Sequence, residues 1–90
     1  MPRQPMPYHS YSVYLISFAT PEIAELVKRG ELHITQPTQL RSESFYFGDN
    51  ERQAGVKFYQ AAKAGMSSPL AFSVVVRRDS RMLVQMSFDR

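Results

Sequence analysis

Residues 11–30, YSVYLISFATPEIAELVKRG, decide most of the expected fold. Residues 11–18 are rich in β-branched and aromatic side chains, which is typical of a β-strand. Successive side chains point to opposite faces of a strand, and apolar residues fall on both faces here, which favours a central position in a sheet. One face carries Tyr11, Val13 and Leu15, and the other carries Tyr14, Ile16 and Phe18.

The second half of this stretch predicts a helix that begins after Thr20 and ends at Gly30. A threonine can cap the first turn, and Pro21 suits the first helical position because its missing N–H would have no partner there. Glycine commonly follows the last turn of a helix. The apolar stripe at helical spacing consists of Ile23, Leu26 and Val27.

The middle of the chain predicts two more strands and a second helix. The segment 31–36 alternates polar and apolar residues and stops at Pro37, and 40–47 ends in an aromatic triplet. The second helix is expected to begin at Asn50, which can cap it, and to stop at Gly65.

The C-terminal part predicts a hairpin of two strands, 70–77 and 82–88, joined by a turn. The choice of cross-strand pairs decides which side chains share a face. A three- or five-residue loop, or a bulge, would give one wholly apolar face, and we expect one of these. The pairs would then be Val76 with Met82, Val74 with Val84, Phe72 with Met86 and Leu70 with Phe88.

These elements predict an α+β fold, namely a single ferredoxin-like βαββαβ layer with an extra C-terminal strand that forms the hairpin. Two helices would pack on one face of a mainly antiparallel sheet, because right-handed crossovers place both there. The single α+β domain would span residues 8–90. Residues 1–7 contain three prolines and predict a flexible Pro-rich tail.

Composition argues against an enzyme. The chain has 90 residues and no cysteine, and its four glycines are scattered rather than clustered as in a phosphate-binding loop. Glu31 and His33 would point the same way from one strand, but two ligands do not make a metal site. We therefore expect no catalytic residues, no metal and no cofactor.

The positive charge is concentrated near the hairpin turn. Residues 1–60 carry six Lys or Arg and six Asp or Glu, so the whole net charge of +3 lies in residues 61–90. Three arginines near the turn can bind phosphates or an acidic protein surface, and an acidic residue among them favours a protein surface. The predicted partner-binding residues are Arg77, Arg78, Asp79 and Arg81.

Two aromatic segments suggest an alternative. Residues 13–18 (VYLISF) and 44–48 (SFYFG) resemble the first- and third-strand motifs of RNA-recognition motifs. The resemblance implies RNA or single-stranded DNA stacked on Tyr14, Phe45 and Phe47, with the arginines at 77, 78 and 81 on phosphates. Glu43 and Ser44 stand where the family has a basic residue and a glycine, and an acidic side chain disfavours a phosphate there.

The function expected from the sequence is therefore that of a small non-enzymatic binding protein. Its partner would be a protein surface of a larger complex, which it would bind as an inhibitor or adaptor. Phage- or mobile-element-encoded blockers of host defence complexes are examples of this type. No signal peptide or membrane span is recognisable, so a cytoplasmic location is expected. A homodimer through the C-terminal edge strand, residues 82–88, is a further expectation.

Overall fold

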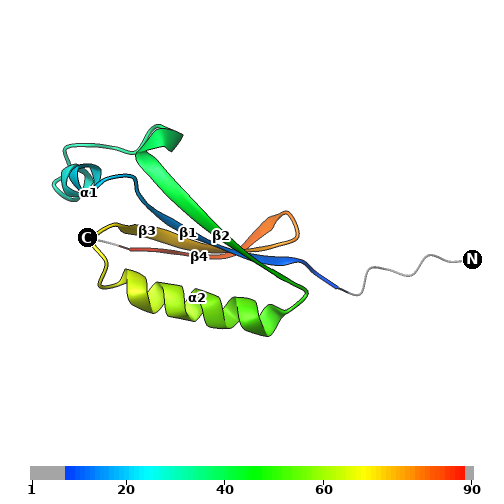
Figure 1. The fold of residues 1–90 in the computed structure, drawn as a ribbon. Helices are drawn as coiled ribbons and strands as arrows, with labels where there is room; N and C mark the ends of the chain where they lie inside the picture. The colour runs from blue at the N-terminus through cyan, green and yellow to red at the C-terminus, as the bar shows by residue number, and fades with distance from the viewer. Residues whose placement is uncertain (1–7, 89–90) are drawn as a thin grey trace, which may run out of the picture.

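A four-stranded antiparallel sheet forms the centre of the computed structural model, which describes residues 8–88. The strand order is β2-β1-β3-β4, with β1 (Tyr11–Phe18) and β3 (Ala71–Arg78) inside and β2 (Leu40–Gly48) and β4 (Arg81–Ser87) at the edges. Helix α1 (Pro21–Lys28), a 3-10 turn and helix α2 (Glu51–Gly65) complete the fold (Figure 1). The mixed α+β class is confirmed, and the predicted 1–7 tail lies outside the described residues. Residues 8–88 contain no helix long and apolar enough to cross a membrane.

Both helices begin and end where their capping residues predict. The Thr20 side chain accepts a hydrogen bond from the Ile23 N–H at 3.2 Å, and Gly30 has a φ of 72° just beyond α1. Asn50 Oδ1 accepts from the Gln53 N–H at 3.0 Å at the start of α2.

The core lies between α2 and one face of the sheet. Val13 of β1 is fully buried and sits between Phe45 of β2 and Val76 of β3. Ala54 and Ala61 of α2 belong to the same cluster, because short side chains let the helix approach the strands closely. The predicted central position of β1 in the sheet is confirmed.

Three expectations are wrong. Residues 31–36 form no strand: Glu31 instead lies 3.5 Å from Arg29 in an ion pair, and Pro37 opens the 3-10 turn. The complete βαββαβ order is therefore not formed within residues 8–88. The two helices do not share one face either, since α2 lies along the sheet while α1 packs at its end beside Phe18 (Figure 1). The strand that ends in the aromatic triplet, β2, lies at an edge of the sheet.

The third wrong expectation concerns which residues face each other across the hairpin. Only two residues, Asp79 and Ser80, connect its strands, and a bulge shifts the register, so that Arg77 faces Met82 and Val76 faces Val84. The bulge was among the predicted possibilities, and the paired side chains Val74, Val76, Val84 and Met86 share one apolar face as expected, but the partners of Val74 and Val76 are each shifted by two residues. The register shifts because β4 contains one extra residue, Leu83, at the bulge. The pairs away from the turn are Val75 with Gln85, Val74 with Met86 and Ser73 with Ser87.

Two glycines of α2 give opposite predictions for stability. Open space surrounds the position of a Cβ at Gly55, so Gly55→Ala should raise the free energy of unfolding by about 0.5–1 kcal/mol. The ring of Phe88 fills that position at Gly65, so Gly65→Ala should lower it by about 1–3 kcal/mol. Urea unfolding of both variants measures the difference, and equal stabilities would contradict the packing of Phe88 on α2.

Candidate functional site

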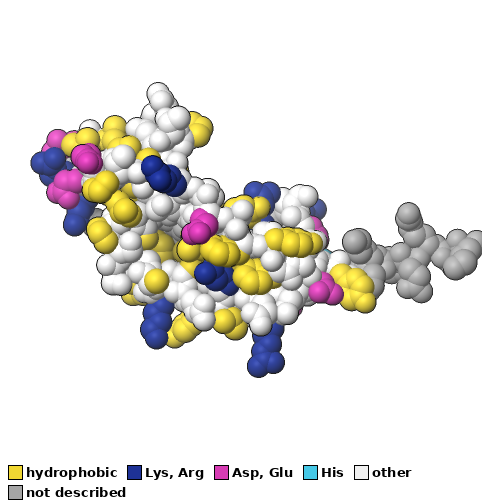
Figure 2. Space-filling model, in the orientation of Figure 1, with side chains coloured by type: hydrophobic (Ala, Val, Ile, Leu, Met, Phe, Trp, Pro, Cys, Tyr) yellow, Lys and Arg dark blue, Asp and Glu magenta, His cyan; other side chains and the backbone are white. Residues whose placement is uncertain are grey.

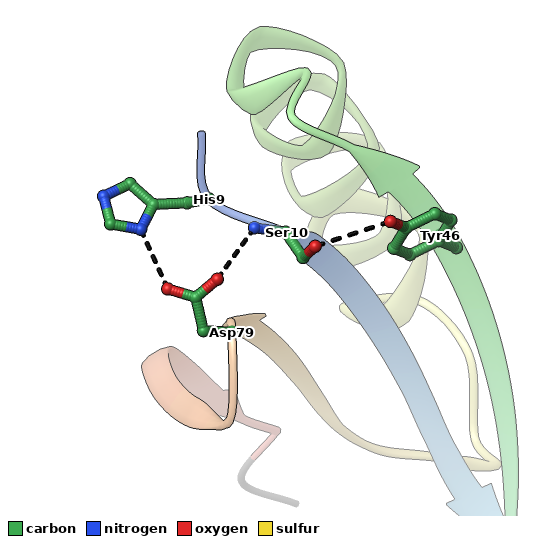
Figure 3. Close-up of polar contacts among 4 residues, drawn as sticks. All are labelled: His9, Ser10, Tyr46 and Asp79. Carbon is green, nitrogen blue, oxygen red and sulfur yellow. Dashed lines mark hydrogen bonds and ion pairs between the residues drawn. The ribbon is translucent and has the colours of Figure 1, made fainter. Parts of the chain in front are cut away.

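The β3–β4 turn is tied to the start of β1. Asp79 has a φ of 59°, and its N–H donates to the Ser10 carbonyl at 2.7 Å. One carboxylate oxygen of Asp79 accepts from the Ser10 N–H at 2.9 Å, and the other lies 2.8 Å from His9 Nδ1 (Figure 3). The Ser10 hydroxyl lies 3.4 Å from the Tyr46 hydroxyl, so the contact reaches β2 as well. Asp79 therefore fixes the hairpin end against the residues that precede β1, and Ser10 extends the contact to β2.

These contacts favour the ionised carboxylate. The N–H of Ser10 and then the ring of His9 lower the pKa of Asp79 below its ordinary value, and the charge of Arg78 adds to the effect. A lowered pKa means that the contacts stabilise the folded state at neutral pH. That stabilisation is lost as the pH falls through the folded-state pKa.

Three arginines flank the hairpin turn. Arg78 and Arg81 face each other across the hairpin, and neither forms an ion pair within residues 8–88. Arg77 donates to the Ser80 carbonyl at 2.8 Å and so helps to close the turn. We call Arg77, Arg78 and Arg81 the arginine tip. Because Asp79 bonds to His9 and Ser10, the positive charge of the tip is available to a partner.

Charges elsewhere are arranged differently. Figure 2 shows acidic and basic side chains side by side over α1 and the segment that follows it, where Arg29 contacts both Glu25 and Glu31. Basic side chains also project from the outer side of α2. The hairpin end differs from both regions because its arginines lie on two paired strands.

The three aromatic residues expected to stack bases do not share a face. Tyr14 pairs with Ser44, whereas Phe45 pairs with Val13, so Tyr14 lies on the opposite side of the sheet from Phe45. Phe47 packs against the core beneath α2. The ammonium of Lys57 lies 4.1 Å from the centre of the Phe45 ring and occupies its face. A common stacking platform is therefore not formed.

His33 has no ligand set around it. The residue is exposed in the segment between α1 and the 3-10 turn, and Glu31 is paired with Arg29. Within the described part of the chain, no group of three or more His, Asp or Glu side chains could hold a metal ion. His33 thus lies outside the assembled contacts, whereas His9, which sequence reasoning left aside, lies within them.

A groove of about 440 Å³ opens between α2 and the sheet. Small residues of α2, Ala61 and Gly65, leave this space over β1 and β2. Arg41 and Glu43 are the ionisable side chains in its lining, which otherwise contains apolar and serine side chains. One carboxylate without a second acid or a histidine is a poor set for acid–base catalysis. The groove was not expected from the sequence, because it depends on how α2 packs.

No protein-family model, curated protein or solved structure matches the chain. Its function must therefore be argued from its own geometry.

Acidification should release the turn. In an NMR titration, the Ser10 amide proton should shift with a midpoint below the pKa of an aspartate in an unfolded peptide, because its carboxylate acceptor is protonated only there. Asp79→Asn is the matched control, since asparagine tolerates a positive φ but does not titrate. A midpoint at or above the ordinary aspartate value would contradict the contact.

Proposed function

We propose that the protein is a small non-enzymatic binding protein whose arginine tip docks on an acidic surface of a larger protein complex. The observation that carries this proposal is the pairing of Arg78 with Arg81 without a carboxylate partner in residues 8–88. Like charges directly opposite each other on two strands destabilise a sheet. An acidic partner would remove that repulsion and add charge-assisted hydrogen bonds.

The shape of the turn supports a protein partner. A two-residue turn held at Asp79 by Ser10 and His9 presents its guanidinium groups on a fixed support, which lowers the entropy lost on binding. Guanidinium groups bind carboxylates in a bidentate geometry. The protein would act as an inhibitor or an adaptor of a larger complex. One form of this role is a phage- or mobile-element-encoded blocker of a cytoplasmic host defence complex. The ferredoxin-like relationship of the fold is likewise a proposal, with the hairpin strand β4 as the added element.

Photo-cross-linking at the tip tests this proposal. A photoreactive amino acid at Ser80, between Arg78 and Arg81, should give one protein adduct in the cells that make the chain. The double variant Arg78→Glu/Arg81→Glu should reduce the adduct roughly 100-fold or more, because two charge-assisted hydrogen bonds of about 1.5 kcal/mol each would be lost.

The control carries the same change of charge on another surface. Arg52→Glu/Lys63→Glu, on α2, should leave the adduct unchanged. A Ser80 adduct that survives reversal of the tip charges would contradict the proposal. A nucleic-acid adduct, together with a high ratio of absorbance at 260 nm to that at 280 nm that falls in a high-salt wash, would replace it by direct RNA or single-stranded DNA binding.

A further inference from the structure

The two edge strands of the sheet differ in their side chains. An edge strand presents unpaired backbone N–H and C=O groups, and charged residues or prolines discourage another strand from pairing there. Edge strand β2 carries Arg41 and Glu43. Edge strand β4 has neither a charged residue nor a proline from Met82 to Ser87. By its composition, β4 is the edge open to pairing.

Apolar side chains are also left uncovered along β4. Met82, Leu83 and Val84 are 58%, 45% and 41% exposed. Helix α2 packs mainly over β3, β1 and β2, and it covers this run only in part. Three consecutive exposed apolar residues on an edge strand mark a surface that a further strand would bury.

The hydrogen bonds of β4 determine which backbone groups are available. The Phe88 N–H donates to the Phe72 carbonyl across the hairpin at 3.0 Å. In an antiparallel pair, alternate residues direct their backbone groups to the same neighbour. Met86 and Val84 therefore also direct their backbone N–H and C=O groups toward β3, whereas Gln85 directs its backbone N–H and C=O away from β3. Gln85 is thus the natural centre of a new ladder.

We propose that β4 pairs antiparallel with β4 of a second copy of this chain, across a two-fold axis at Gln85. Val84 would then face the partner's Met86 on the side of the sheet that carries α2, and Gln85 would face the partner's Gln85 on the other side. No charged side chains meet between Val84 and Ser87, so the segment is complementary to itself. The two four-stranded sheets would join into one of eight strands.

The pairing has a consequence for the arginine tip. Arg81 lies four residues from the axis, so the two tips would stand about 26 Å apart along the ribbon, at a rise of about 3.3 Å per residue. A dimer would thus present two cationic ends that point in opposite directions. Two binding ends on one particle raise the affinity for a repetitive partner without any new contact. The dimer itself does not depend on the proposed function of the tip.

Charges placed at the axis test the proposal. By sedimentation equilibrium at about 100 μM, the unaltered chain should have twice its mass of 10.3 kDa. Gln85→Lys and Gln85→Glu should each raise the dimer dissociation constant about tenfold or more, because like charges would meet at the axis. An equimolar mixture of the two variants should restore dimers, because opposite charges then meet.

Ser44→Lys provides the control, since it adds the same charge to the other edge strand and should leave the dimer intact. Arg78→Glu/Arg81→Glu should also leave it intact, which separates a failure of the dimer from a failure of docking at the tip. A monomer at 100 μM would overturn the proposal, and so would a dimer that Gln85→Lys leaves unchanged. A monomer whose β4 backbone amides become protected from hydrogen exchange only when a different protein is present would mean that β4 pairs with a strand of that protein instead.

Discussion

Hydrogen bonding of β1 along both of its edges is the constraint on which the other elements depend. Val13 at its centre is flanked by Phe45 and Val76, and all three lie in or beside the layer that α2 covers. Because β2 and β3 are both antiparallel to β1, they run parallel to each other, and the chain crosses the sheet between them through α2. A central strand with apolar residues on both faces satisfies this arrangement, whereas a strand with one polar face would expose or bury the wrong side chains.

The second constraint is the contact between the hairpin turn and the start of β1. Asp79 accepts hydrogen bonds there, and within the described residues it forms no ion pair with Arg78 or Arg81, although the charge of Arg78 helps to lower its pKa. Two arginines side by side cost stability in a small domain, about 0.2–1 kcal/mol for a cross-strand pair of like charges. The same contacts that hold the turn in place thus create the concentration of positive charge that a partner can recognise. The Asp79 carboxylate therefore affects both the position of the turn and the charge that a partner would contact.

Local signals predicted the parts of the fold that depend on neighbouring residues. Thr20 and Asn50 predicted the helix starts, and the apolar residues on both faces of 11–18 predicted the central position of β1. The sequence could not show that residues 31–36 remain without a strand partner, because that depends on where α1 packs. It likewise could not show that His9 meets Asp79, since the two are 70 residues apart and neither lies in a recognisable motif. Aromatic composition alone also could not place Tyr14 and Phe45 on opposite faces, which required the register between two strands.

The width of a single helix explains why β4 remains exposed. An α-helix with its side chains is about 10 Å across, and neighbouring strands are about 4.8 Å apart, so one helix spans about two interstrand distances and covers at most three strands. Helix α2 lies over β1 and its neighbours, and α1 is placed at the end of the sheet beside Phe18 rather than alongside α2. A four-stranded sheet with one helix along its face therefore leaves an edge uncovered. In β2 that edge is polar, with Arg41 and Glu43, whereas in β4 it is apolar, so the incomplete cover becomes a surface suited to another strand.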